Sequence, residues 1–131
     1  MVKRNITNIL FSGINPHSGE NGLIGYEDRV IELGIKNLKK ELPEIRLSGP
    51  YAGDTLFFQG NTSADLFIYS SHDQGLNVFK QYNGLQGINL TLGLPFIRVS
   101  PDHGTAFELY GKNEANYLGM NYLLGEILKW R

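Results

Sequence analysis

Cysteine is absent from the sequence, which excludes disulfides, thiolate catalysis and cysteine-ligated zinc sites. The chain also has no apolar run of transmembrane length, and its N-terminus lacks the apolar core of a signal peptide. Neither sign of charge is in large excess, because the formal net charge is −1 and the isoelectric point is about 6.3. We therefore expect a cytoplasmic protein without nucleic-acid or membrane partners.

The length and the order of the expected elements indicate one α/β domain. A chain of 131 residues has the size of a single domain and can bury a core of its own. The order β-α-β-β-α-β-β-α is typical of a layered α/β domain, with a largely buried sheet and flanking helices, over residues 1–131. The expected strands cover residues 6–14, 44–48, 66–69, 88–92 and 96–99, and the expected helices cover residues 27–42, 75–82 and 113–130.

Three segments carry the clearest patterns. In residues 27–42, apolar side chains recur at the spacing of one helical face, and Pro43 ends the helix. The short strand at residues 44–48 is closed by a Gly-Pro pair. Residues 66–69 are continuously apolar, which is the pattern of a strand buried on both faces.

All three histidines follow a strand-like run and precede a glycine-containing turn. Ligands of α/β proteins bind where such strands end, and neutral imidazole is the commonest metal ligand. His17 and His72 follow strands that could be neighbours, while Asp54 and Asp73 supply carboxylates. Such a set suits zinc, manganese, cobalt or iron better than calcium. The alternative left open by the spacing is that these histidines, with His103, are unrelated polar loop residues.

A second candidate site would bind an anion. Lys80, Asn89 and Arg98 lie in or beside the elements that follow His72. Arg98 interrupts a short apolar strand, so its guanidinium needs either an anionic partner or a solvent-facing side. Together the three side chains would make a clamp for a phosphate. An edge strand with Arg98 facing outward is the alternative.

Common nucleotide-binding loops are absent. The sequence contains neither G-x-G-x-x-G nor G-x-x-x-x-G-K-[ST], so a nucleotide would have to be held in another way.

Four blocks of the sequence together resemble the 4-hydroxythreonine-4-phosphate dehydrogenase family. They are residues 13–20 (GINPHSGE), 71–76 (SHDQGL), 89–98 (NLTLGLPFIR) and 102–106 (DHGTA). The blocks occur in the order of the family, cover nearly the whole chain and correspond to the C-terminal half of the family's protein. The implied fold is therefore part of an isocitrate/isopropylmalate dehydrogenase-like architecture.

This resemblance implies a role for each matched residue. The metal would be zinc, magnesium, manganese or cobalt, the second cofactor would be NAD or NADP, and the carboxylates would orient a histidine or relay a proton. The implied assignments are His17 and His72 to the metal, Asp54 and Asp73 to catalysis, Lys80, Asn89 and Arg98 to the phosphorylated substrate, and His103, Gly104 and Thr105 to the nucleotide.

The family's reaction is the oxidation and decarboxylation of 4-phosphooxy-L-threonine to 3-amino-2-oxopropyl phosphate, in pyridoxal phosphate biosynthesis. Family members are homodimers with the metal site at the interface. Because the N-terminal half would carry the third metal histidine, we expect the isolated chain to be inactive. Asn77 stands where the family pattern has proline. The alternatives are a dehydrogenase of another phosphorylated hydroxy acid, such as a phosphorylated threonate, or an inactive half-domain that dimerises.

Overall fold

The computed structural model describes residues 5–60 and 64–130, which divide into two compact units. The N-terminal unit comprises residues 5–78 and the C-terminal unit comprises residues 79–130. Helix α3 (His72–Asn83) runs across this division. Within the described ranges, no helix has the length and apolar character needed to cross a membrane.

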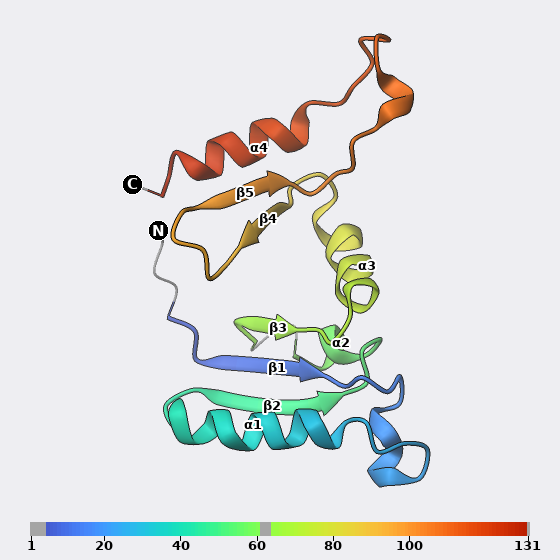
Figure 1. Cartoon of the computed structure of the whole chain (residues 1–131), viewed down its shortest axis with the longest axis vertical. Coiled ribbons are helices and arrows are strands. Elements are labelled where there is room, and N and C mark those ends of the chain that lie inside the picture. Colours follow the sequence, from blue (N-terminus) through green and yellow to red (C-terminus); the bar gives the residue numbers. More distant parts are fainter. Residues whose placement is uncertain (1–4, 61–63, 131) are drawn as a thin grey trace. The chain divides into compact units, whose positions relative to one another are not determined.

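A three-stranded parallel sheet forms the N-terminal unit. Strand β1 (Asn8–Ser12) lies in the middle, between β2 (Arg46–Tyr51) and β3 (Leu66–Ile68) (Figure 1). Helix α1 (Arg29–Glu41) joins β1 to β2 and packs against the sheet. This β-α-β unit follows from the alternation of apolar strands with an amphipathic helix.

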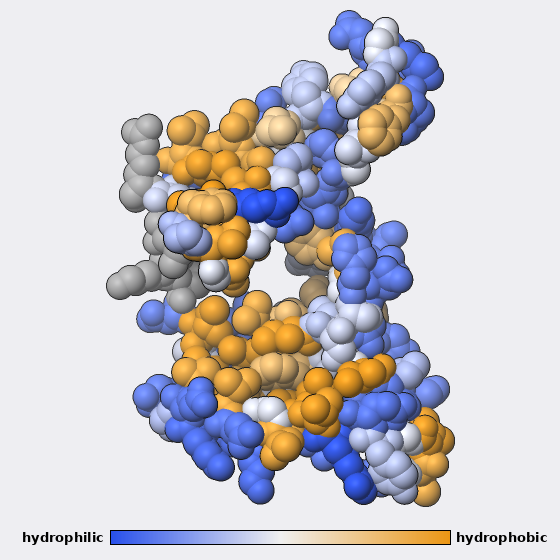
Figure 2. Space-filling view, in the orientation of Figure 1, coloured by the Kyte–Doolittle hydropathy of each residue, from blue (hydrophilic) through white to orange (hydrophobic). Residues whose placement is uncertain are grey.

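The core of this unit lies between α1 and the sheet. Ile35 of α1 is buried against Ile9 of β1 and Leu47 of β2. Ile31 and Leu38 flank Ile35 on the same helical face and are partly buried there, which confirms the predicted helix and its apolar side. In Figure 2 the strands of this unit carry apolar colouring, whereas α1 shows hydrophilic residues together with some apolar ones.

Strand β2 continues through Gly49 to Tyr51, so the predicted end before Gly49 is wrong. The backbone of Gly49 has a φ of 136°, and a Cβ atom there would lie 2.5 Å from the carbonyl oxygen of Phe11. Only glycine fits so close to β1 in this conformation. The pairing of β1 with β2 also shifts register between Leu10 and Ser12. Gly49 therefore allows the strand to continue past this irregularity.

Strand β3 is an edge strand, which corrects the prediction that it is buried on both faces. Leu66 and Ile68 are each 38% exposed. Within the described sheet, β3 has β1 on one side only. Helix α2 (Leu56–Gly60), in a segment for which no regular element was predicted, contacts β1 and contributes the fully buried Leu56.

Helix α3 begins at His72, earlier than the predicted start at Gly75. Gly75 packs closely against an aromatic ring, because a Cβ atom there would lie 2.9 Å from Cδ2 of Tyr69. The absence of a side chain at Gly75 thus lets the first turn of α3 pack against the Tyr69 ring, where the sequence analysis expected a glycine-containing turn after His72. Burial raises the pKa of the Tyr69 hydroxyl above its usual range.

The C-terminal unit contains an antiparallel strand pair, not a continuation of the parallel sheet. Strands β4 (Ile88–Thr91) and β5 (Arg98–Pro101) pair with each other, so the prediction of one layered sheet is wrong for the described residues. Helix α4 (Leu118–Ile127) runs along β5, with Leu123 buried (Figure 1). A short 3₁₀ turn, η2, covers Phe107–Leu109.

Both β5 and α4 start later than their predicted positions. The side chain of Asn116 accepts a hydrogen bond from the amide of Leu118 at 3.0 Å. A side-chain acceptor of this kind satisfies a free amide at a helix start, in agreement with a start of α4 at Leu118.

Candidate active site

The parallel strands bring three loops to one edge of the N-terminal sheet. Because β1, β2 and β3 run in the same direction, the segments that follow them leave from the same edge. His17 follows β1, Asp54 follows β2, and Asp73 follows β3.

These three residues line one cavity. The cavity has a volume of about 490 Å³, and the rest of its lining is Pro16, Gly53, Gln74, Asn77 and Val78. The structure thus brings together His17, Asp54 and Asp73, which the sequence analysis proposed as metal-binding and catalytic residues. Imidazole and carboxylate groups are donor types that divalent cations prefer, and both can exchange protons with a bound ligand.

His72 does not line this cavity. It lies in the first turn of α3 beside Asp73, and its side chain is exposed. Within the described ranges, no group of three or more histidine, aspartate or glutamate side chains is placed to hold a metal ion. One copy of the described chain therefore presents suitable donor types, but not a complete metal site.

The loop that carries His17 is fixed by buried polar side chains. The side-chain oxygen of Asn15 accepts a hydrogen bond from the amide of His17 at 2.9 Å. Asp28 is 4% exposed, and its Oδ1 accepts hydrogen bonds from the amides of Ile14 and Asn15. The amide of Glu27 itself, followed by the side chain of Asn15, lowers the pKa of the Glu27 carboxyl.

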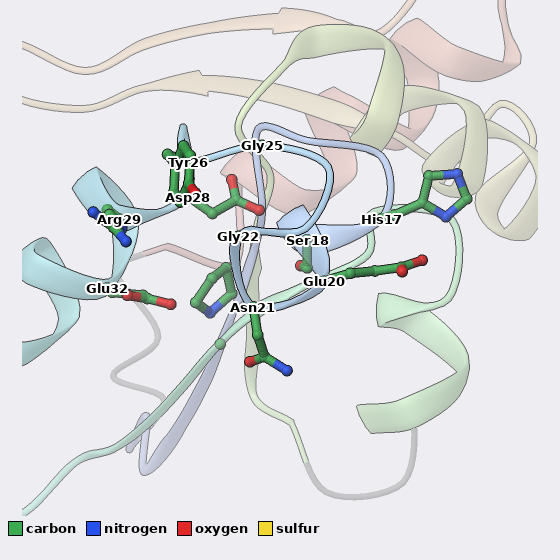
Figure 3. Close-up of a pocket in the computed structure, with 12 residues that line it drawn as sticks. His17, Ser18, Glu20, Asn21, Gly22, Gly25, Tyr26, Asp28, Arg29 and Glu32 are labelled. Atoms are coloured by element: carbon green, nitrogen blue, oxygen red, sulfur yellow. The ribbon is translucent and has the colours of Figure 1, made fainter.

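After His17 the chain forms a left-handed turn, η1 (Ser18–Gly22). Ser18, Glu20 and Asn21 have φ values of 54°, 44° and 58°, which are costly for residues other than glycine. A second cavity of about 540 Å³ lies against this turn (Figure 3). In that view the His17 imidazole and the Glu20 side chain extend on the side opposite Arg29 and Glu32. Strain of this kind beside a candidate ligand is typical of functional loops.

In the C-terminal unit, Asn89 and Arg98 lie on one face of the strand pair. Thr91 pairs with Arg98, and Asn89 pairs with Ser100. Directly paired residues of antiparallel strands share a face, and so do residues two apart along a strand. The Arg98 guanidinium is exposed and donates a hydrogen bond to the Thr91 hydroxyl at 2.8 Å. The structure therefore brings Asn89 and Arg98 together on a polar face.

The other predicted residues of this unit lie on separate elements. Lys80 is exposed on α3. His103, Gly104 and Thr105 are exposed in the loop after β5, and Nδ1 of His103 lies 3.0 Å from the carbonyl oxygen of Gly104. A Cβ atom added to Gly119 would lie 3.3 Å from Cδ2 of His103, so the imidazole packs against the start of α4.

Comparison with known proteins gives the family. Residues 2–122 match the family model described as pyridoxal phosphate biosynthetic protein PdxA. The chain belongs to this family.

Similar proteins agree with the PdxA family model. A 4-hydroxythreonine-4-phosphate dehydrogenase from Zymomonas mobilis is 46% identical over 121 residues, and one from Neisseria meningitidis serogroup A is 47% identical over 113 residues. These matches cover 88% and 82% of this chain, but only 36% and 33% of the relatives. The chain thus spans about a third of the curated relatives it matches.

A solved structure agrees as well. The crystal structure of 4-hydroxythreonine-4-phosphate dehydrogenase from Klebsiella pneumoniae matches 98% of this chain and 39% of its own, with a TM-score of 0.80 and 33% sequence identity. The mixed α/β architecture with a parallel sheet and helices is therefore that of a PdxA protein.

Sequence reasoning did not identify three side chains that shape this candidate site: Asn15, Asp28 and Gln74. Their roles depend on backbone groups of distant segments, which composition and spacing do not reveal. A sequence signal existed for Asn15, because asparagine before a turn commonly bonds to the backbone two residues later. Gln74 lies inside the conspicuous 71–76 block but carries no charge that would have marked it.

Proposed function

We propose that this chain forms the C-terminal part of a 4-hydroxythreonine-4-phosphate dehydrogenase, an oxidoreductase of pyridoxal phosphate biosynthesis. In this proposal residues 1–131 make one domain of an isopropylmalate dehydrogenase-like protein in the cytoplasm. The observation that carries the proposal is the single cavity lined by His17, Asp54 and Asp73 at the carboxyl ends of the parallel strands. PdxA family membership supports the reaction and its phosphorylated substrate.

The donor types at this cavity fit a divalent metal such as zinc, magnesium, manganese or cobalt. In the proposal His17 and His72 bind the metal, and further ligands come from a second copy or from another part of the protein. The bound metal would supply Lewis acidity at the substrate hydroxyl. His72 is exposed and does not line the cavity of His17, so in this proposal it reaches the metal at an interface between copies.

Asp54 and Asp73 would handle the proton of the reaction. Both line the cavity of His17, so either carboxylate can take the substrate hydroxyl proton or orient an imidazole. Loss of that proton would accompany transfer of a hydride from the carbon that bears this hydroxyl, and NAD or NADP would supply the redox chemistry by accepting the hydride. The resulting β-keto acid then loses carbon dioxide to give 3-amino-2-oxopropyl phosphate.

The substrate phosphate would bind at the polar face of the β4–β5 pair. Asn89 and Arg98 share that face, and both side chains are exposed to a ligand. A guanidinium and an amide donate hydrogen bonds to phosphate oxygens in fixed directions. We assign Lys80 to the same phosphate, and His103, Gly104 and Thr105 to the nucleotide, by their match to the family pattern.

The proposal requires a fusion protein for its test, since the chain spans about a third of its relatives. The isolated chain is expected to show no turnover of 4-phosphooxy-L-threonine with NAD, because catalytic groups that act together fail together. Fusion to the N-terminal part of the Zymomonas mobilis relative should give turnover. Faster turnover of a phosphorylated threonate by the same fusion would contradict the proposed substrate.

Arg98→Ala in that fusion tests the phosphate assignment. Loss of a charged hydrogen bond to phosphate should cost roughly 2–3 kcal/mol, or about 30- to 150-fold in kcat/KM for the substrate. The KM for NAD should stay unchanged. A raised KM for NAD with an unchanged substrate KM would show that Arg98 is misassigned.

Homodimer formation is the remaining part of the proposal. Sedimentation of the fusion protein should give the mass of a dimer, and a monomer at micromolar concentration would contradict an interfacial metal site.

A further inference from the structure

The side-chain amide of Gln74 contacts three segments of the N-terminal unit. Its Nε2 donates a hydrogen bond to the carbonyl oxygen of Gly13 at 3.1 Å, and its Oε1 accepts one from the amide of Ser71 at 3.1 Å. Oε1 also accepts a hydrogen bond from the Ser12 hydroxyl at 3.2 Å. A Cβ atom added to Gly53 would lie 2.9 Å from Nε2, so the Gly53 backbone packs directly against the same amide.

Each of these segments leads to a residue of the candidate site. Gln74 itself lines the cavity of about 490 Å³ described above. Along the chain, Gly13 is followed by His17, Gly53 by Asp54, and Ser71 by His72.

An amide suits these partners because it donates and accepts at the same time. The Gly13 carbonyl can only accept a hydrogen bond, and the Ser71 amide can only donate one. These two partners define the orientation of the Gln74 amide. A carboxylate at this position would lose the bond to Gly13, and a methionine would lose both bonds.

We propose that Gln74 is a positioning residue that sets the relative placement of the loops carrying His17, Asp54 and His72. This inference rests on the proposed function, which assigns these three residues to the metal and the reaction. Gln74 would act through the backbone of the three loops and would not contact the reacting atoms.

The same strands provide a matched control. The Ser70 amide donates to the Ser12 hydroxyl at 2.7 Å, and the Ser70 hydroxyl donates to the Ser12 carbonyl oxygen at 3.0 Å. Ser70→Ala removes the second bond and also the bond that the Ser12 hydroxyl donates to the Ser70 hydroxyl at 3.3 Å; both join the end of β1 to the segment after β3. It leaves the contacts of Gln74 with Gly13 and Gly53 in place.

The first test needs no metal. Amide NMR signals of His17, Asp54 and His72 are compared among the ¹⁵N-labelled chain, Gln74→Met and Ser70→Ala. In Gln74→Met all three signals should shift, and hydrogen exchange at the Ser71 amide should rise about 10-fold with the loss of its bond. Ser70→Ala should leave the Asp54 signal in place. Unchanged His17 and Asp54 signals in Gln74→Met, or equal shifts in both variants, would overturn the proposal.

Gln74→Glu provides a second variant that does not depend on the folding of Gln74→Met. Its ionised carboxylate keeps acceptors for Ser71 and Ser12 but cannot donate to Gly13. The lost donor should therefore shift the His17 and Asp54 signals at neutral pH, while exchange at the Ser71 amide stays close to that of the wild-type chain. Wild-type His17 and Asp54 signals in Gln74→Glu would overturn the proposal.

Co²⁺ titration of the same variants separates this proposal from the proposed function. Gln74→Met should bind Co²⁺ about 10-fold more weakly than the wild-type chain, as is typical when the support of a ligand is lost. Equal affinity, together with unshifted amide signals, would overturn the role of Gln74. A wild-type chain that binds no Co²⁺ would instead contradict the metal assignment, and the amide signals would still decide the role of Gln74.

Discussion

The two units of the chain bury their apolar side chains to very different degrees. In the N-terminal unit, Ile9, Ile35, Leu47 and Leu56 are at most 8% exposed and form a core around the parallel sheet. In the described part of the C-terminal unit, Leu123 is the buried large hydrophobic residue. The loop between β4 and β5 leaves Leu92, Phe96 and Ile97 between 63% and 80% exposed.

This difference matches a difference between the two candidate sites. The loop of His17 is held by buried side chains, whereas Asn89 and Arg98 lie on an exposed face. A site built on a packed core keeps its geometry in the isolated unit. An exposed strand pair with apolar side chains in solvent depends more on what packs against it. We therefore expect the N-terminal unit to be the more stable of the two.

The largest expected effect comes from Gly49→Ala in the N-terminal unit. The new Cβ atom would lie 2.5 Å from a backbone oxygen of β1, at a φ of 136°. Strain and steric overlap together should lower the free energy of unfolding by about 3–5 kcal/mol. Urea unfolding followed by circular dichroism measures the change.

Gly34→Ala is the control for this substitution. Gly34 lies in α1 with nothing within 4 Å of an added Cβ atom, so alanine should stabilise the helix by about 0.5–1 kcal/mol. If both substitutions had similar effects on the free energy of unfolding, β1 and β2 would not approach each other as closely at Gly49 as described.

Leu56→Ala tests the core of the same unit with a somewhat smaller effect. Leu56 is fully buried, so truncation should cost about 2–5 kcal/mol through lost burial and a cavity. Leu92→Ala, at a position that is 80% exposed, should change stability by less than about 0.5 kcal/mol. A larger loss from Leu92→Ala would reverse the comparison of the two units.

The smallest expected effect is a pH dependence at Asp65. The amide of Thr7, followed by its hydroxyl and the amide of Asn8, lowers the pKa of the Asp65 carboxyl. A lowered pKa stabilises the folded state above the unfolded value of about 3.9, and this stabilisation is lost as the pH falls through the folded pKa.

Thermal unfolding between pH 6 and pH 2.5 measures this contribution. The melting temperature of the wild-type chain should fall more steeply toward acidic pH than that of Asp65→Asn. Parallel curves for the two proteins would show that Asp65 does not tether β3 to β1.

Much of the fold was predictable because it depends on local patterns. The apolar face of α1 and the short alternating strand β4 are visible in the sequence. The exposure of β3 was not, because a run of apolar residues has the same pattern in a central strand and in an edge strand. The extension of β2 depends on the space beside Phe11, which the local sequence of Gly49 does not encode.

The candidate site was predictable in part, because its residues follow strands that the sequence reveals. Residues after successive parallel strands meet at one edge, so His17, Asp54 and Asp73 could be grouped from the sequence. The sequence did not indicate that His72 would lie outside their cavity. That placement depends on the helical start of α3, which the sequence placed at Gly75.

The most direct test of the account is a Co²⁺ titration of the chain with each of its three histidines replaced by alanine. The account predicts that His17→Ala and His72→Ala each weaken Co²⁺ binding, whereas His103→Ala leaves it unchanged. His103 packs beside Gly119 in the C-terminal unit, whereas the carboxylates that line the cavity of His17 belong to the N-terminal unit. A loss of affinity in His103→Ala equal to that in His72→Ala would contradict the assignment of the metal to the loops of the parallel sheet.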